Sequence, residues 1–184
     1  MKSRRPVMRA LAVGLVLAGL AAMARGAYIP VKAELAQWLI GRAWAASKSA
    51  GRPTKPWLWA DFQTVARLYV PRLGETLYVL SDASGRSLAF GPGVVWRGPG
   101  TMVIAGHQDT HFRFLDRLVA GDRIRVEPSS GAATVFRVAE RRILAGSKLA
   151  LGQFGDRDRL ILSTCWPFDG LPGRRPDRLL IIAE

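Results

Sequence analysis

The sequence predicts a mainly β domain, built as a sandwich or a barrel, behind a helical N-terminal region. From Thr64 onward, short runs rich in Val, Ile, Leu, Tyr and Phe alternate with turn residues such as Gly91-Pro92-Gly93 and Ser129-Ser130-Gly131. Regularly spaced short strands separated by turn residues are typical of all-β sandwiches and barrels. Hydrophobic residues make up 49% of the 184-residue chain, which is enough for a packed core.

Residues 1–27 have the layout of an export signal. A leader with four basic residues, the last of them Arg9, precedes the uncharged apolar stretch 10–24. We expect an uncleaved signal-anchor that crosses the cytoplasmic (inner) membrane once. The Ala-Met-Ala sequence at 22–24 also resembles a cleavage site, so a cleaved signal peptide is the alternative. Both alternatives place the rest of the chain on the periplasmic or extracytoplasmic side.

The charge balance is strongly basic. The chain has 27 Lys and Arg residues against 14 Asp and Glu residues, a formal net charge of +13. The basic residues beyond Arg9 are scattered and no nucleic-acid module is visible, so we expect no nucleic-acid partner. Attraction to anionic membrane lipid is a simpler explanation of the charge near the N-terminus.

Residues 28–60 are expected to link the N-terminal segment to the β domain. Good helix formers dominate 31–49, with Leu35 and Leu39 at helical spacing, and a Gly-Arg-Pro sequence ends the pattern. The next stretch, GRPTKPWLWADFQ at 51–63, is expected to be extended and docked on the β domain.

The β domain is expected to occupy residues 61–184. One or two short helical turns are expected, at 111–119 and 147–154. The predicted strands are the apolar runs TVARLYVPRL (64–73), TLYVLSD (76–82), TMVIAGH (101–107), DRIRVEP (122–128), ATVFRVAERRIL (133–144), RLILSTC (159–165) and RLLIIAE (178–184).

Cys165 is the single cysteine of the chain. A lone cysteine is more often a small buried hydrophobic residue than a nucleophile. An unpaired thiol outside the cytoplasm is, however, open to oxidation and mispairing, so its presence in an exported chain suggests a function. Cys165 also ends an apolar run and precedes Trp166-Pro167, which places it at the rim of the predicted sheet.

The chain has two histidines, His107 and His111. A thiolate nucleophile needs a nearby base or cation at neutral pH, and imidazole is the usual one. His107 ends a predicted strand, as Cys165 does, and Gly106 beside it leaves room for a close approach of the backbone. We therefore expect His107 to be the partner of the thiol and His111 to be a surface or loop-packing residue.

A zinc site is the alternative use of the histidines. HQDTH places them at i and i+4, the spacing of zinc-protease helices. Gln108 stands where such an enzyme needs a glutamate base, and no third ligand is evident, so we expect no metal and no cofactor. Asp109 and Asp116 could orient a histidine or cap a helical turn, and we expect capping.

Arg178 begins the last predicted strand. If RLILSTC and RLLIIAE form an antiparallel hairpin, Cys165 and Arg178 lie at the same end of it. A guanidinium held there could donate hydrogen bonds to a developing oxyanion. The alternative is a solvated surface arginine.

These features together resemble the sortases, membrane-anchored cysteine transpeptidases that join proteins to surface components. The resemblance covers about residues 64–184, where His107, Cys165 and an arginine near the C-terminus follow the family's order. The family's TLxTC motif appears as ILSTC, with Ile161 where the family most often has threonine. PWLWADF and STCWPF look most like the single sortases of Gram-negative (marine-type) proteobacteria.

The resemblance implies an eight-stranded β-barrel with short helices. It also implies Cys165 as the nucleophile, His107 as the acid/base and Arg178 as the stabiliser of oxyanion and substrate. The residues expected to contact substrate are Thr164, Trp166 and Ala105.

The family's reaction cleaves an LPxTG-like C-terminal sorting signal between Thr and Gly. An amine then resolves the thioester acyl-enzyme, or water does when no amine is available. The partners implied are an exported protein with a sorting signal, an amine acceptor and the membrane. Two other functions stay open: a hydrolytic cysteine protease with the same three residues, and a non-catalytic membrane-anchored β-barrel binding module.

Overall fold

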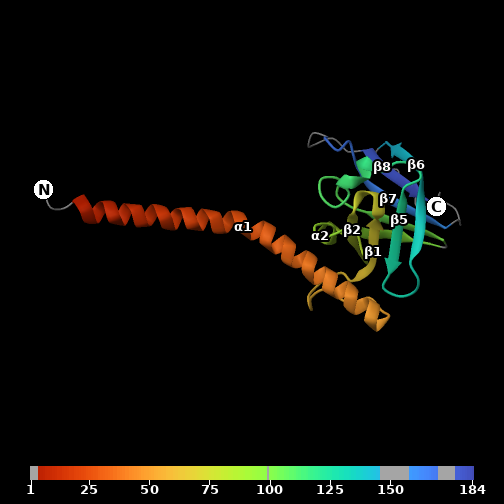
Figure 1. Cartoon of the computed structure of the whole chain (residues 1–184), viewed down its shortest axis with the longest axis horizontal. Helices are drawn as coiled ribbons and strands as arrows, with labels where there is room; N and C mark the ends of the chain where they lie inside the picture. Colours follow the sequence, from red (N-terminus) through yellow and green to blue (C-terminus); the bar gives the residue numbers. More distant parts are fainter. Residues whose placement is uncertain (1–3, 99, 146–157, 170–176) are drawn as a thin grey trace. The chain divides into compact units, whose positions relative to one another are not determined.

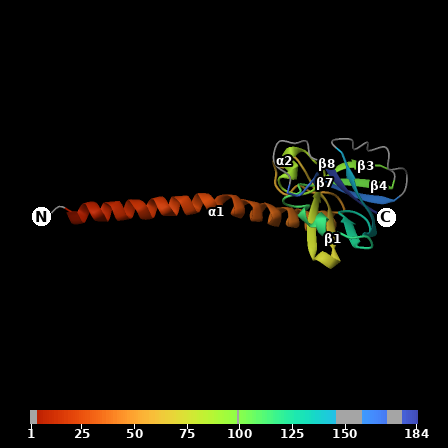
Figure 2. The ribbon, with the colours of Figure 1, turned by 90° about the horizontal axis from the view of Figure 1, so that it is seen from above.

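The computed structural model describes residues 4–98, 100–145, 158–169 and 177–184 of the chain. The chain divides into two compact units, Met1–Trp38 and Leu39–Glu184. The first unit is helical, and the second contains the β domain (Figure 1). The view from above shows the same division between helix and sheet (Figure 2).

Helix α1, Arg4–Ala50, forms the first unit and continues into the second. The helix predicted over 31–49 is thus the last part of a longer helix. Gly51 follows it with a φ of 65°, the left-handed conformation that commonly ends helices.

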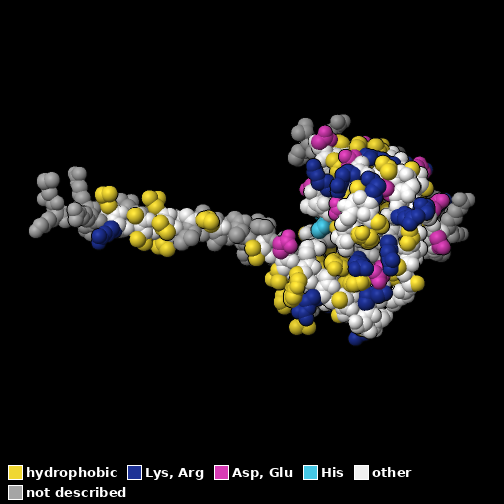
Figure 3. Space-filling view, in the orientation of Figure 1, with side chains coloured by type: hydrophobic (Ala, Val, Ile, Leu, Met, Phe, Trp, Pro, Cys, Tyr) yellow, Lys and Arg dark blue, Asp and Glu magenta, His cyan; other side chains and the backbone are white. Residues whose placement is uncertain are grey.

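Apolar side chains of the first unit are exposed along the described part of the helix (Figure 3). Val13, Leu15 and Leu17 are examples, with exposed fractions of 58%, 72% and 60%. Among the residues that the structure describes, no helix is long and apolar enough to span a membrane.

In the described part of the chain, eight strands close into a barrel in the order β1-β2-β3-β4-β7-β8-β6-β5. The strand pairs β2–β3 and β4–β7 are parallel, and the other neighbours are antiparallel. The bounds are β1 Thr64–Val70, β2 Glu75–Leu80, β3 Gly93–Arg97, β4 Thr101–Ala105, β5 Arg123–Pro128, β6 Thr134–Leu144, β7 Arg159–Trp166 and β8 Asp177–Ala183.

Short helical elements connect some of the strands. They are the 3-10 helix η1, Pro71–Leu73, the helix α2, Gly85–Leu88, and the 3-10 helix η2, Arg113–Arg117. The predicted mixed β-barrel with short helices is therefore confirmed.

Two apolar layers lie on the two faces of the sheet formed by β4, β7 and β8. Because successive side chains of a strand point to opposite faces, Leu160 and Leu162 belong to one layer and Ile161 to the other. The first layer is the barrel interior and includes Phe112 and Leu115, which precede and form part of η2. The second layer covers the outer face and contains Val103, Ile161, Leu180 and Ile182.

The last turns of α1 pack on the barrel within the second unit. Ile40 is 1% exposed and lies in a cluster with Phe62 and Leu80. The predicted docking of 51–63 is confirmed at Trp57, whose ring makes edge contacts with Phe62 and Phe90 at centroid distances of 5.5 and 5.4 Å.

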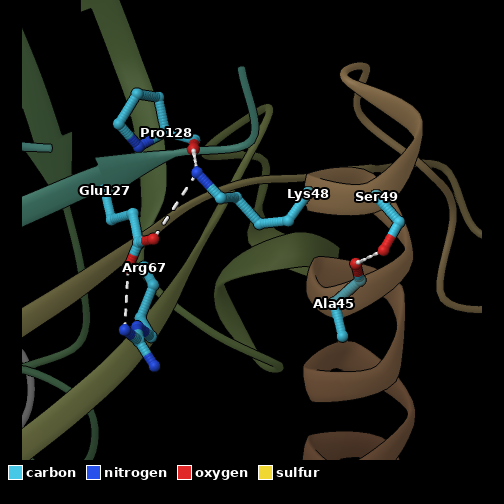
Figure 4. A network of polar contacts seen from close by, with 6 residues as sticks. All are labelled: Ala45, Lys48, Ser49, Arg67, Glu127 and Pro128. Carbon is cyan, nitrogen blue, oxygen red and sulfur yellow. Dashed lines mark hydrogen bonds and ion pairs between the residues drawn. The ribbon is translucent and has the colours of Figure 1, made fainter. Parts of the chain in front are cut away.

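Polar contacts add to this packing (Figure 4). The Lys48 ammonium donates to the Pro128 carbonyl at 3.5 Å and lies 3.5 Å from a Glu127 carboxylate oxygen. Arg67 of β1 binds the other oxygen of Glu127 at 2.7 Å. The end of α1 is thereby linked to both β1 and β5 (Figure 4).

The seven predicted strands are all present, while β3 and α2 were not predicted. Both lie between the predicted strands 76–82 and 101–107, where we predicted turn residues and no helix or strand. At Gly93 a Cβ atom would lie 1.9 Å from the Asp82 carbonyl oxygen, so this glycine is required by close backbone packing beside β2. The helical turn predicted at 111–119 is confirmed as η2, and the one at 147–154 lies outside the described residues.

Candidate active site

Strand pairing brings the ends of β4, β7 and β8 together. Cys165 is directly opposite Arg178 in the antiparallel β7–β8 pair, as the hairpin hypothesis predicted. Residues opposite each other in such a pair have Cβ atoms about 4.5–5.5 Å apart.

The parallel pairing of β4 with β7 brings His107 to the same end. Ala105 is opposite Ser163, and the Gly106 amide extends this ladder by donating to the Ser163 carbonyl at 3.1 Å. His107 follows immediately and is exposed. The three residues therefore come from three neighbouring strands at one end of the sheet.

The thiol and the guanidinium lie on the outer face of this sheet. The register of β7 is unbroken, so Cys165 shares its face with Ile161, and Arg178 shares its face with Leu180. The side chains of Cys165 and Arg178 are each half-buried. A substrate can therefore reach the thiol from outside the barrel.

The loop after β4 depends on the absence of a side chain at Gly106. A Cβ atom there would lie 2.8 Å from the Phe112 ring, which is fully buried in the barrel interior. The Phe112 amide donates to the His107 carbonyl at 2.9 Å and closes the loop. A close approach at Gly106 was expected of the backbone, and the approaching group is instead the Phe112 side chain.

Thr164 connects β7, which carries Cys165, to the loop after β4, which contains His107. Its hydroxyl donates to the Gly106 carbonyl at 2.8 Å, and the residue is 0% exposed. The whole residue is buried, and its predicted contact with substrate stays a prediction.

Trp166 also points away from the thiol, toward the barrel interior, where it packs against the core. Its ring meets Phe168 edge-on at a centroid distance of 5.5 Å, and the Arg141 guanidinium lies 5.1 Å from its centroid. Of the three residues predicted to contact substrate, only Ala105 shares the outer face with Cys165. Ser163 lies on the same face, and we had not singled it out, because nothing in its sequence context distinguishes it.

His111 lies in the loop that His107 begins, and it is half-buried. Burial, and then the charge of nearby His107, lower the pKa of His111 below its usual range. The His111 imidazole is therefore mainly neutral at neutral pH, and its burial agrees with the expected packing role.

The capping role expected for Asp116 is wrong. Asp116 lies inside η2, whose N-cap residue, Phe112, makes no side-chain capping bond. The Asp116 carboxylate instead binds Arg141 of β6 at 3.0 Å, because the barrel closes β6 against this side of η2. Asp109 is exposed.

A closed mixed barrel with a free thiol, an imidazole and a guanidinium at one end of three neighbouring strands has the parts of a cysteine acyl-transfer enzyme. Comparison with known proteins identifies the family. The chain belongs to the sortase family of cysteine transpeptidases, since residues 68–184 match the sortase domain.

Individual relatives agree with this assignment. Sortase D of Bacillus subtilis (strain 168) is 33% identical over 85 residues, which are 46% of this chain and 42% of that protein. The match thus spans less than half of the length of this curated relative.

Solved structures share the fold. Sortase A from Corynebacterium diphtheriae aligns with a TM-score of 0.58 at 22% identity, over 68% of this chain and 61% of that one. A Clostridium perfringens Sortase D5 transpeptidase aligns with a TM-score of 0.55 at 20% identity, over 66% and 78% of the two chains.

Proposed function

We propose that this chain is a sortase-type transpeptidase in which Cys165, His107 and Arg178 form the catalytic centre. The observation that carries the proposal is the pairing of Cys165 with Arg178 on the outer face of the sheet, beside the His107 loop. Membership of the sortase family supports it independently.

In the first half-reaction, the Cys165 thiol gives its proton to His107, and its sulfur attacks the scissile carbonyl carbon of a peptide. Arg178 donates hydrogen bonds to the oxyanion of the tetrahedral intermediate. His107 then protonates the leaving amine, and collapse of the intermediate leaves a thioester.

In the second half-reaction, an amine attacks the thioester carbonyl. His107 accepts the proton of the amine, Arg178 again stabilises the oxyanion, and the thiolate leaves. A thioester reacts readily with amines, which favours transfer over hydrolysis when an acceptor is present.

We assign the substrate as an exported protein with an LPxTG-like C-terminal sorting signal. Ala105 is partly exposed on the outer face, one row away from the thiol, so it can line the route of such an extended peptide. Its side chain is small and leaves room for peptide backbone.

Attachment to the inner membrane through residues 1–27 is part of the same proposal, with a linker at 28–60 and the catalytic barrel at 61–184. The basic leader and the apolar stretch 10–24 support it. The PWLWADF and STCWPF sequences support placing the chain with the single sortases of Gram-negative bacteria. Fractionation of cells that express the full chain, followed by sequencing of its N-terminus, tests anchoring and cleavage.

The central experiment measures cleavage of an LPxTG-type peptide with and without a soluble amine. Cys165→Ala and His107→Ala should each abolish cleavage, while His111→Asn, the matched change at the second histidine, should retain most of it. Arg178→Lys should be strongly damaging, because an ammonium cannot reproduce the planar fork of guanidinium donors.

The same assay separates the alternatives. A peptide–amine adduct supports a transpeptidase, and free acid alone, even at high amine concentration, supports a hydrolytic protease. Full cleavage by both Cys165→Ala and His107→Ala would exclude the proposed centre.

A further inference from the structure

Arg141 of β6 contacts both β7, the strand that carries Cys165, and η2, the helical turn that follows the His107 loop. Its guanidinium is 5.1 Å from the centroid of the Trp166 ring. The same guanidinium donates to the Asp116 carboxylate at 3.0 Å and to the Asp116 carbonyl at 3.1 Å. One side chain thus contacts two elements that are far apart in the sequence.

Both contacts are adjacent to residues of the proposed centre. Trp166 directly follows Cys165 in β7. Asp116 belongs to η2, which follows the loop closed by the bond between the Phe112 amide and the His107 carbonyl. A series of contacts therefore connects the end of β7 with η2 through Trp166 and Arg141, and the Arg141–Asp116 ion pair is itself exposed to solvent.

The Thr164–Gly106 hydrogen bond also connects β7 to the segment before His107, beside the bond from the Gly106 amide to the Ser163 carbonyl. It lies within the sheet, before the strand end, whereas Arg141 acts beyond it, where Trp166 ends β7. Without Arg141, the last residue of β7 keeps its apolar packing against Phe168 but loses its link to η2.

We infer that Arg141 is a positioning residue, which acts through Trp166 and η2 to hold the Cys165 strand end against the His107 loop. Its catalytic consequence rests on the proposed function. The guanidinium suits this position because it can stack on an aromatic face while its N–H groups bind a carboxylate and a carbonyl.

Arg67 of β1 provides a matched control. Its guanidinium also lies over an aromatic ring, 4.5 Å from the Trp44 centroid, and it binds a carboxylate oxygen of Glu127 at 2.7 Å. In the barrel order, β1 is separated from β7 by three strands on either side. Arg67→Ala therefore removes the same charge and the same two kinds of contact without touching the contacts between β7 and η2.

The test measures alkylation of Cys165 by iodoacetamide across pH, in the full-length chain, together with cleavage of an LPxTG-type peptide. For Arg141→Ala we expect the pH profile of alkylation to move toward that of His107→Ala, and kcat to fall about threefold to tenfold with little change in KM. Arg67→Ala should match the unmodified protein in both assays. Arg141→Lys should recover only part of the loss.

Asp116→Asn and Trp166→Phe test these contacts without removing the arginine. If Arg141 and Asp116 act as one unit, Arg141→Ala combined with Asp116→Asn should be no slower than Arg141→Ala alone. Additive losses, or an Arg141→Ala profile identical to that of Arg67→Ala, would overturn the inference. If Arg141→Ala does not fold, Asp116→Asn alone must show the shifted pH profile of Cys165 alkylation. An unshifted profile in that variant rejects the positioning role of Arg141.

An unchanged alkylation profile in His107→Ala would instead count against the proposed catalytic centre. That outcome is distinguishable, because the peptide assay would then also retain cleavage in His107→Ala. The proposed catalytic centre is therefore refuted by results on His107→Ala, and the positioning role of Arg141 by results on Arg141→Ala and Asp116→Asn.

Discussion

At the scale of single residues, the centre depends on two neighbours of the proposed catalytic residues, Gly106 and Thr164. Gly106 has no side chain because the Phe112 ring occupies that space. Thr164 uses its hydroxyl inside the protein, on the Gly106 carbonyl. Both therefore define where His107 and Cys165 lie relative to each other.

Gly106→Ala should displace the loop that begins at His107. The added methyl group would lie 2.8 Å from the Phe112 ring, which is buried and cannot move freely. Overpacking of this kind costs about 1–3 kcal/mol, measurable as a lower free energy of unfolding in urea. We also expect a loss of peptide cleavage.

Gly85→Ala is the matched control for that change. Nothing lies within 4 Å of a Cβ atom at Gly85, which begins α2. A stability loss at Gly85→Ala as large as that at Gly106→Ala would show that crowding by Phe112 is not the cause.

Thr164→Val should destabilise the protein, although valine has the same shape as threonine. The Gly106 carbonyl would lose its hydroxyl donor in a buried position, which costs about 1–3 kcal/mol. Thr164→Ser keeps the donor and should retain more of the stability and of the peptide cleavage. Equal stability of the valine and serine variants in urea unfolding would contradict this role.

At the scale of elements, the end of α1 is part of the β domain's packing. Ile40 and the cluster around Phe62 fill the space between this part of the helix and β2. The Lys48–Glu127–Arg67 contacts lie partly in solvent and add little by comparison. The apolar contacts therefore dominate the docking of Leu39–Ala50.

Ile40→Ala should lower the free energy of unfolding by about 2–5 kcal/mol, because the removed side chain is 1% exposed. The same substitution at Ile143 of β6, which is 47% exposed, should cost much less. Thermal unfolding of the two variants gives the comparison. Equal losses would mean that the end of α1 does not pack on the barrel in solution.

At the scale of the whole molecule, an ion pair between the buried Asp122 carboxylate and the half-exposed Arg72 guanidinium makes stability depend on pH. Asp122 is 7% exposed, and Arg72 binds its carboxylate through two bonds, one of them 2.7 Å long. The hydrogen bond from Arg72 holds the pKa of Asp122 below its ordinary value, against the opposing effect of burial. The same pair connects η1 with the turn before β5.

This pair should make the protein less stable in acid. Because the pKa of Asp122 is lower in the folded than in the unfolded state, its contribution is complete above the unfolded value of about 3.9 and is lost as the pH falls through the folded value. Urea unfolding at a series of pH values should show a weaker loss in acid for Asp122→Asn. An identical pH dependence of the variant and the unmodified protein would contradict this assignment.

Much of the fold follows from local sequence. The β runs carry alternating or continuous apolar residues, and each is bounded by turn residues, so seven strands and η2 could be predicted. β3 could not, because its short GVVWR run lies between glycines and gains its structure from pairing with β4. Asp116 could not be assigned either, since its partner Arg141 is distant in the chain.

The sequence by itself determined the inventory of the centre: one thiol, two histidines, and an arginine at the start of the last β run. It also determined that Cys165 and His107 lie near strand ends, because residue type and turn signals act locally. Only the tertiary structure decided which face each side chain takes. The parallel β4–β7 and antiparallel β7–β8 registers turn Cys165 and Arg178 outward and Thr164 and Trp166 inward, and register depends on pairing between distant strands.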